Sequence, residues 1–190
     1  MASLLKSTHN TRAILPGRMR FIRSDAPTKL SGGEIQWLWE QHITTIVDLR
    51  TPEEQKERPC PLASDDRFSY FCMPVTGGNT LPNTVEDVAQ SYIQMSDTQM
   101  QEIIDRIWNA KTNVLYFCSA GKDRTGVVSA LLLIKAGFSD QAILEDYMLS
   151  KDNLADILTS YCAKHPQIDP RIVTPNAQYM KAFLNWYRHQ

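Results

Sequence analysis

Residues 114–126 read Val-Leu-Tyr-Phe-Cys-Ser-Ala-Gly-Lys-Asp-Arg-Thr-Gly, and this stretch decides the fold class that we expect. An apolar segment runs into Cys118, a short loop containing Gly121 follows, and Thr125 opens a second apolar run. The pattern predicts a buried strand, a tight turn and the start of a helix. Backbone N–H groups at such a turn and the helix dipole both attract negative charge. We therefore expect an anion-binding loop between a strand and a helix.

Two side chains of this loop can carry chemistry. Inward-facing amides and the helix dipole favour the thiolate form of Cys118, which is then a nucleophile. The guanidinium of Arg124 offers a planar fork of N–H donors that matches two phosphoryl oxygens. The thiolate can attack phosphorus while the arginine holds the equatorial oxygens, a reaction that needs no metal ion or cofactor. The residues expected to bind the phosphate group are Ser119, Ala120, Gly121, Lys122, Asp123, Arg124 and Thr125.

Two other interpretations of these residues compete with this one. A cysteine that ends an apolar strand is most often a small buried residue. The arginine six positions later, followed by Thr-Gly before a helix, argues against that interpretation. A nucleotide-binding Walker A loop needs glycine where this chain has Tyr116, and serine or threonine where it has Asp123. The loop is therefore predicted to be of the thiol type.

The spacing Cys-x5-Arg-Thr over residues 118–125 resembles the signature loop of the cysteine-dependent protein tyrosine phosphatases. The string CSAGKDRTG is similar to the loop of a bacterial and fungal tyrosine phosphatase family whose activity overlaps with that of phosphoinositide phosphatases. Residues 22–26 and 46–54 resemble early segments of that family more weakly. One difference is Phe117, where many tyrosine phosphatases carry histidine. Any stabilisation of the thiolate by that histidine must here come from elsewhere, or be smaller.

The resemblance implies a phosphomonoester hydrolase that acts through a phosphocysteine intermediate on phosphotyrosine or related substrates. A phosphoinositide phosphatase is the first alternative, because the same chemistry would act on a lipid headgroup. A catalytically inactive phosphate-binding signalling module is another, although intact Cys118 and Arg124 argue against it. A redox role for Cys118 is a third alternative, but no resolving cysteine lies near it in the sequence.

The proton donor for the leaving oxygen is the role that the sequence assigns least directly. Many tyrosine phosphatases use an aspartate in a Trp-Pro-Asp segment, and this chain has no such segment. Asp123 is the first candidate because it lies inside the loop; its alternative role is to orient the loop or Arg124. Asp48 is the second candidate, and its alternative role is an ion pair with Arg50 or a brace for the loop.

Lys122 and Thr125 have two interpretations each. Lys122 adds positive charge that suits a second phosphate or acidic neighbours on a substrate, or it is simply a solvated lysine. Thr125 can donate its hydroxyl to the sulfur of Cys118, or it caps the following helix.

Length and composition set the remaining expectations. A chain of 190 residues fits one domain, residues 1–190, and a net charge of −1 gives no overall attraction to nucleic acid. The four cysteines and four histidines are scattered, so we expect no zinc site, and a working thiolate favours a reducing compartment. No signal peptide or membrane-spanning stretch is apparent. We expect a cytoplasmic protein without integral membrane contact; non-classical export and the oligomeric state stay open.

Alternating strands and helices predict an α/β fold with a central, largely parallel sheet flanked by helices, as in the tyrosine phosphatases. The expected strands are residues 19–23, 43–49, 68–75 and 114–117. The first expected helix starts at a capping box at residues 31–34 and continues, by apolar residues at helical spacing, to residue 42. The other expected helices cover residues 85–110 (as one or two helices), 125–136, 139–149, 153–163 and 176–188. Carboxyl ends of parallel strands meet at one sheet edge, so residues 48–50 and Cys118 should lie together.

Overall fold

The computed structural model describes residues 3–190, and its centre is a five-stranded sheet with the order β1-β2-β5-β3-β4. Strand β1 pairs with β2 in antiparallel orientation, whereas the pairs β2–β5, β5–β3 and β3–β4 are parallel. The strands are β1 (Arg12–Leu15), β2 (Arg18–Ser24), β3 (Ile43–Asp48), β4 (Ser69–Cys72) and β5 (Asn113–Phe117). The predicted α/β class and largely parallel sheet are confirmed.

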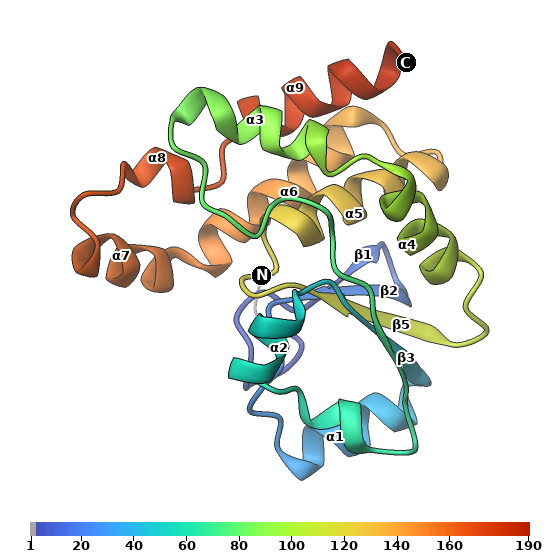
Figure 1. Cartoon of the computed structure of the whole chain (residues 1–190). Coiled ribbons are helices and arrows are strands. Elements are labelled where there is room, and N and C mark those ends of the chain that lie inside the picture. Colours follow the sequence, from blue (N-terminus) through green and yellow to red (C-terminus); the bar gives the residue numbers. More distant parts are fainter. Residues whose placement is uncertain (1–2) are drawn as a thin grey trace.

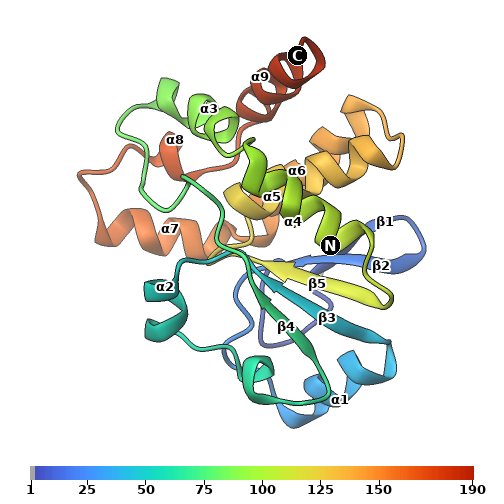
Figure 2. The same cartoon turned by 45° about the vertical axis from the view of Figure 1, so that its right-hand side comes forward.

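Helices cover both faces of the sheet (Figures 1 and 2). One face carries α1 (Gly32–Glu40) and the short helix η1 (Pro61–Ser64). The other carries α3 (Val85–Gln94), α4 (Thr98–Trp108), α5 (Asp123–Lys135), α6 (Asp140–Asn153) and α9 (Ala177–Arg188). The remaining helices are α2 (Pro52–Glu57), which follows β3, and α7 (Ala155–Lys164) and α8 (Pro170–Val173), which extend to one side of the molecule in Figure 1.

The central strand β5 is apolar throughout because both of its faces are buried. Leu115 and Phe117 pack into the core on the α1 side, whereas Val114 and Tyr116 pack into the larger core on the other side. The alternation of side chains along a strand sends neighbouring residues to opposite faces. A continuous apolar run before Cys118 therefore marks the centre of the sheet.

Helix α5 is also buried on nearly all sides. Each residue from Arg124 to Leu133 is buried, because the helix lies against the sheet and is covered in turn by α3, α4 and α6. This explains why its sequence is apolar all round instead of amphipathic. The first turn of the helix, which follows directly on the loop, is therefore packed inside the core.

Most predicted elements occur within one to four residues of their expected ends. The region 85–110 forms two helices, because the side chain of Asp97 accepts a hydrogen bond from the Met100 backbone N–H at 2.9 Å and starts α4 afresh. His42 was expected on the first helix but lies beyond it, with a φ of 55° that reverses the chain into β3. Strand β1 and helices α2, η1 and α8 were not predicted, since each has only four to six residues. In residues 3–190 no helix is both long and apolar enough to cross a membrane.

Candidate active site

The loop 118–124 leaves the central strand at the sheet edge where the parallel strands end. Cys118 follows β5 directly and is 3% exposed. In the register of the sheet, Phe117 lies beside Asp48 on one neighbouring strand and Ser24 on the other. The predicted convergence of residues 48–50 and Cys118 at one edge is therefore confirmed.

The backbone of this loop turns its carbonyl groups outward. The Ser119 carbonyl accepts from the Ala26 N–H at 3.2 Å, and the Gly121 carbonyl accepts from Asn10 Nδ2 and an Arg23 Nη, both at 2.9 Å. Within residues 3–190, by contrast, the backbone N–H groups of residues 119–122 have no hydrogen-bond partner. Carbonyls held from behind and amides left free form the kind of concavity that binds anions.

Gly121 is the residue that allows this backbone course. Its φ is +64°, a left-handed conformation that glycine adopts without steric cost. A Cβ atom added here would lie 2.4 Å from the backbone of Ser24 and Asp25. The loop is thus packed directly against the end of β2, with no room for any other side chain.

Arg124 is held by a glutamate that the sequence analysis did not select. Its two terminal nitrogens donate to the two carboxylate oxygens of Glu54 at 2.6 and 2.7 Å, and Ser119 Oγ donates to the same carboxylate. Glu54 belongs to α2, where a reciprocal capping box with Thr51 fixes the first turn. The Thr-Pro-Glu-Glu pattern at 51–54 is a capping signal that could have located this helix, but not its contact with Arg124.

Electrostatics keep this pair charged. Burial opposes ionisation of Glu54, but hydrogen bonds from Arg124, Ser119 and the Thr51 backbone outweigh it and lower the pKa of Glu54 to about 2. Burial also acts to lower the pKa of Arg124, yet the bond with Glu54 and the negative charges of Cys118, Glu54 and Asp123 together raise it above its usual value.

Asp123 opens helix α5 with its side chain one-third exposed. Tyr92 Oη donates to Asp123 Oδ1, and Lys122 Nζ lies 3.0 Å from Oδ2, so both carboxylate oxygens have partners. Tyr147 Oη lies 2.8 Å from Tyr92 Oη and extends the hydrogen-bonded chain into the core. Burial and the charge of Asp123 raise the pKa of Tyr92 well above its usual value, so Tyr92 stays a donor.

Lys122 does not behave as a solvated lysine. The residue is only 6% exposed and its ammonium pairs with Asp123. Thr125 lies inside the first turn of α5, whose N-cap is Lys122, so the expected capping role for Thr125 is wrong. Its Oγ1 is buried and has no hydrogen-bond partner within the described residues, so donation of this hydroxyl to the sulfur of Cys118 stays a prediction.

Of the two interpretations of Asp48, proton donor or partner of Arg50, its contacts support the second. Its carboxylate is fully buried and accepts from Arg50 Nε at 2.9 Å, Arg50 Nη2 at 2.7 Å and Tyr70 Oη at 2.6 Å. Burial and the negative charge of Asp48 raise the pKa of Tyr70, which keeps the phenol protonated. The Arg50 guanidinium also lies 5.2 Å from the ring centroid of Phe117, the residue that precedes Cys118. A carboxylate so fully occupied is poorly suited to give a proton to a substrate.

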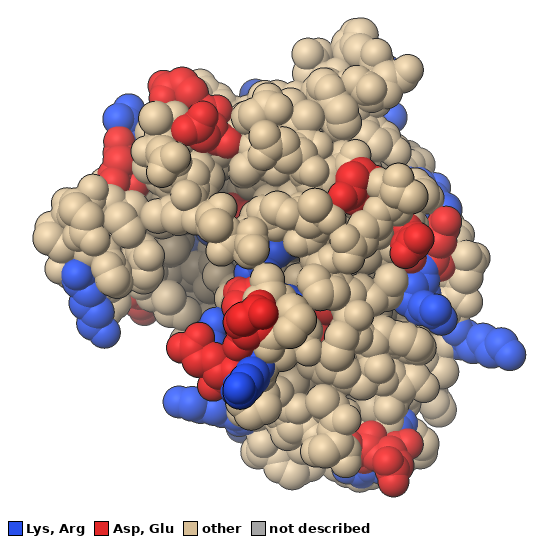
Figure 3. Space-filling model, in the orientation of Figure 1, with Lys and Arg blue, Asp and Glu red and all other residues tan. Residues whose placement is uncertain are grey.

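A pocket of about 250 Å³ adjoins the loop at Asp123. Apart from that carboxylate, its wall is neutral and consists of Gly78, Asn79, Thr80, Leu81, Pro82, Val88, Ser91, Tyr92, Met95 and Ile172. Gly78 reaches close to Arg124, because a Cβ added there would lie 3.0 Å from its Cγ. Figure 3 shows basic atoms recessed near the middle of this face, with acidic side chains over α2 beside them.

Among residues 3–190, no three His, Cys, Asp or Glu side chains are grouped as ligands of a metal ion would be. The site residues that sequence reasoning missed are Asn10, Arg23, Glu54, Tyr92 and Asp146. Arg23 and Glu54 lie in the segments 22–26 and 46–54 that weakly resemble early segments of the phosphatase family, but no spacing in the sequence predicts the contacts of these five residues.

Comparisons with known proteins agree with this geometry. Residues 6–190 match the model of a family described as the tyrosine phosphatase family. A tyrosine-protein phosphatase of Nostoc commune is 29% identical over 140 residues, which cover 68% of this chain and 48% of that protein. The triple specificity protein phosphatase PtpB of Mycobacterium tuberculosis is 28% identical over 181 residues, covering 76% of this chain and 65% of that protein.

Among solved structures, the human tyrosine phosphatase-like serine/threonine/tyrosine-interacting protein aligns over 94% of this chain and 96% of its own, with 17% identity and a TM-score of 0.47. The chain spans less than two thirds of the length of the two curated relatives, at 48% and 65%.

Proposed function

The chain belongs to the tyrosine phosphatase family, and we propose that it hydrolyses phosphate monoesters through Cys118, with phosphotyrosine as the substrate class. The observation that carries the proposal is the loop itself: it has a buried thiol at one end and a buried guanidinium at the other. Within the described residues the N–H groups of residues 119–122 have no partner, whereas the carbonyls of Ser119 and Gly121 are bound from behind. Such an arrangement favours a dianion and a trigonal-bipyramidal phosphorus.

The reaction proceeds in two displacements. The Cys118 thiolate attacks phosphorus, so that an S–P bond forms while the P–O bond to the leaving group breaks. Arg124 and the loop amides hold the equatorial oxygens, and the leaving oxygen takes a proton from Asp123. Water then attacks phosphorus and gives its proton to the Asp123 carboxylate, and the S–P bond breaks to release inorganic phosphate and the thiolate.

Asp123 needs a proton for the first step, although its partners Lys122 and Tyr92 stabilise the carboxylate. A bound phosphate dianion attracts Lys122 and places negative charge beside Asp123. By drawing Lys122 towards itself, the phosphate group weakens the ion pair between Lys122 and Asp123.

Phosphotyrosine is favoured over a phosphoinositide by the pocket beside Asp123. Its walls are apolar or neutral, and its single charge is negative. An aromatic ring suits such walls, whereas an inositol ring that carries further phosphates would meet the Asp123 carboxylate, whose basic partner Lys122 is not part of the pocket wall. A thiolate enzyme also requires a reducing environment such as the cytoplasm.

The test is the initial rate of the wild type and of Cys118→Ser on a phosphotyrosine peptide, the matching phosphoserine peptide and phosphoinositides, with and without EDTA. We expect the variant to lose turnover on phosphotyrosine and to keep its affinity for phosphate. Cys72→Ser, the same change at an exposed thiol, is the control and should retain full activity. Full activity of Cys118→Ser, or complete loss in EDTA, would contradict the mechanism. Faster turnover of phosphoinositides than of phosphotyrosine would assign the lipid substrate.

A further inference from the structure

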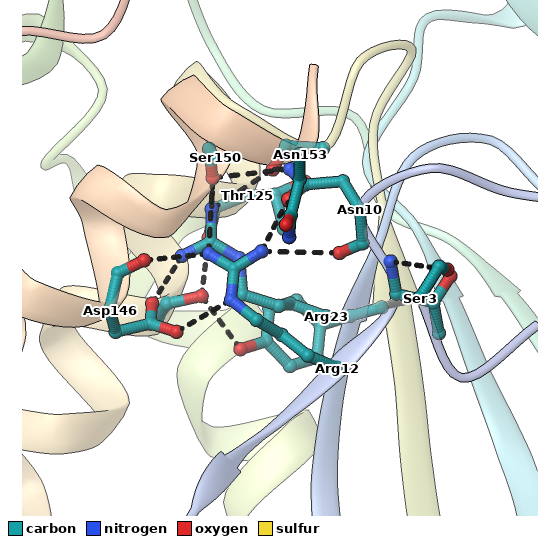
Figure 4. Close-up of polar contacts among 12 residues, drawn as sticks. Ser3, Asn10, Arg12, Arg23, Thr125, Asp146, Ser150 and Asn153 are labelled. Carbon is teal, nitrogen blue, oxygen red and sulfur yellow. Dashed lines mark hydrogen bonds and ion pairs between the residues drawn. The ribbon is translucent and has the colours of Figure 1, made fainter. Parts of the chain in front are cut away.

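A cluster of buried polar side chains lies directly behind the loop (Figure 4). The guanidinium groups of Arg12 and Arg23 share one carboxylate, that of Asp146 on α6: Arg12 Nε lies 2.9 Å from its Oδ1, and Arg23 Nη1 pairs with its Oδ2. Ser150 accepts from both arginines, at 3.0 and 3.4 Å. Both arginines are at most 2% exposed.

The cluster carries more positive than negative charge. Two guanidinium groups face the one carboxylate of Asp146, and Arg23 Nε has no hydrogen-bond partner within the described residues. Burial and the neighbouring Arg23 lower the pKa of Arg12 to about 10, despite Asp146. A buried charge without full compensation is costly to stability. Packing alone therefore does not account for the second arginine.

Only one of the two arginines contacts the loop. Arg23 Nη2 donates to the Gly121 carbonyl at 2.9 Å, and Asn10 Nδ2 donates to the same oxygen at the same distance. Arg12 contacts Asn10, whose side-chain oxygen accepts from Arg12 Nη1, but has no bond to the loop itself. With its oxygen turned to Arg12, the Asn10 side chain presents its NH2 group to the Gly121 carbonyl.

The bond to Gly121 has a consequence on the other side of the peptide. In a trans peptide the C=O and the following N–H point in opposite directions, and no cis peptide occurs in the described chain. Fixing the Gly121 carbonyl towards the cluster therefore aims the Lys122 N–H away from it, into the loop. A carbonyl that accepts from a cation is also polarised, which makes the N–H of the same peptide a stronger donor.

We propose that Arg23, assisted by Asn10, is a positioning residue for the reaction: from the core it holds the Gly121–Lys122 peptide so that the Lys122 N–H faces the phosphate group. The inference rests on the proposed function of the loop as a phosphate site. Arg23 does not touch the substrate; it acts through this one peptide.

The experiment compares Arg23→Gln with Arg12→Gln, which removes the same charge from the same cluster but no direct bond to Gly121, because Arg12 reaches that carbonyl only through Asn10. The readout is the inorganic phosphate concentration that halves the rate of alkylation of Cys118 by iodoacetamide, followed on its peptide by mass spectrometry, together with inhibition by orthovanadate. We expect Arg23→Gln to weaken both about tenfold, the effect of one charge-assisted hydrogen bond. Arg12→Gln should stay within about threefold of the wild type, well under one such bond.

Asn10→Ala removes only the second donor to Gly121 and keeps the test open if Arg23→Gln does not fold. It should weaken phosphate protection by several-fold at unchanged far-ultraviolet circular dichroism. Equal effects of Arg23→Gln and Arg12→Gln, or normal protection in Asn10→Ala, would overturn the inference and leave the cluster a purely structural role. If phosphate fails to protect Cys118 in the wild type, the proposed function itself is wrong, which separates the two failures.

Discussion

Glu54 acts on the candidate site chiefly through its pair with Arg124, in which both carboxylate oxygens accept from the guanidinium, and it also accepts from Ser119 Oγ. The pair holds the guanidinium plane in one orientation, and a small misplacement of a charge clamp is costly because its bonds to the transition state are directional. The low pKa of Glu54, about 2, means that the pair is intact throughout the working range of pH. Since this pKa lies below the ordinary value, the stability that the pair contributes is present above pH 4.5 and is lost as the pH falls through 2.

Glu54→Gln should lower kcat/KM on phosphotyrosine by about 10- to 100-fold. The amide of glutamine has a single oxygen acceptor, so it can bond to only one of the two terminal nitrogens of Arg124. Glu53→Gln is the matched control: this neighbour is exposed and makes no contact with Arg124, so its kcat/KM should stay within about twofold of wild type. The measurement is the steady-state kcat/KM of wild type, Glu54→Gln and Glu53→Gln on phosphotyrosine. A rise in kcat/KM for Glu54→Gln would instead identify the carboxylate as a competitor of the substrate for Arg124.

Tyr92 has the corresponding role for Asp123. Removing its hydroxyl in Tyr92→Phe leaves Asp123 Oδ1 without its donor, so the acid is held less firmly. We expect about a tenfold loss of kcat on phosphotyrosine, whose leaving group needs a proton, and little loss on an aryl phosphate with a very good leaving group. Tyr147→Phe removes a hydroxyl one bond further away and should have a smaller effect.

The comparison of the two substrates is the decisive measurement for Tyr92. Asp123→Asn should show the same dependence on the leaving group, more strongly. Should all variants lose equal rates on both substrates, Asp123 and Tyr92 would be parts of the loop architecture and the acid would lie elsewhere.

At the scale of elements, the loop depends on its contact with the end of β2. Gly121→Ala places a methyl group 2.4 Å from backbone atoms of Ser24 and Asp25, which cannot move aside as a side chain would. Gly17 has nearly the same backbone, with φ +66°, but nothing within 4 Å of an added Cβ. Gly17→Ala should therefore cost only the strain of a left-handed alanine, about 1–2 kcal/mol.

Gly121→Ala should lower the free energy of unfolding by more than Gly17→Ala does, because the steric clash adds to the same backbone strain. It should also abolish orthovanadate binding, because the loop cannot keep its conformation. Urea unfolding and vanadate inhibition, measured on both variants, separate strain from displacement. Normal vanadate affinity in Gly121→Ala would mean that the loop and β2 can move apart without consequence.

At the scale of the whole molecule, Asp146 joins helix α6 to both N-terminal strands through Arg12 and Arg23. Asp146→Asn leaves two buried guanidinium groups without a counter-charge and should lower the free energy of unfolding by about 3–5 kcal/mol. Asp140→Asn is the control on the same helix: its pair with Arg188 is about half exposed, so the loss should be below about 1 kcal/mol.

The loss in Asp146→Asn should depend on pH in a defined direction. Burial opposes ionisation of Asp146, but Arg23 and Arg12 outweigh it and lower its pKa below the usual 3.8. The stabilisation is thus fully present above pH 3.8 and disappears as the pH falls through the lower folded value. Urea midpoints of wild type and variant should differ by a constant amount from pH 7 to pH 5 and approach each other below pH 3.8. A gap that widens on acidification would contradict this assignment.

The sequence by itself determined the parts of this protein that are written in contiguous residues. The stretch 114–126 predicts the central strand, the loop and the buried helix. The signals are local: an apolar run before Cys118, a turn at Gly121 and a second apolar run after Thr125. Strand β3 and its neighbours followed from the same patterns, and with them the sheet edge at which Asp48 and Cys118 meet. The catalytic roles of Cys118, Arg124 and Asp123 stay predictions, supported by geometry.

Only the tertiary structure decided what surrounds the loop. Glu54 is 70 positions from Arg124, and Arg23 is 98 positions from Gly121, so no spacing rule relates them. From the sequence, Asp48 is the second candidate for the acid, with pairing to Arg50 as its alternative role; the hydrogen bonds from Arg50 and Tyr70 occupy both of its buried oxygens. Hydrogen bonds and ion pairs act over about 3 Å in space whatever the distance along the chain, and the fold alone brings such residues within that range.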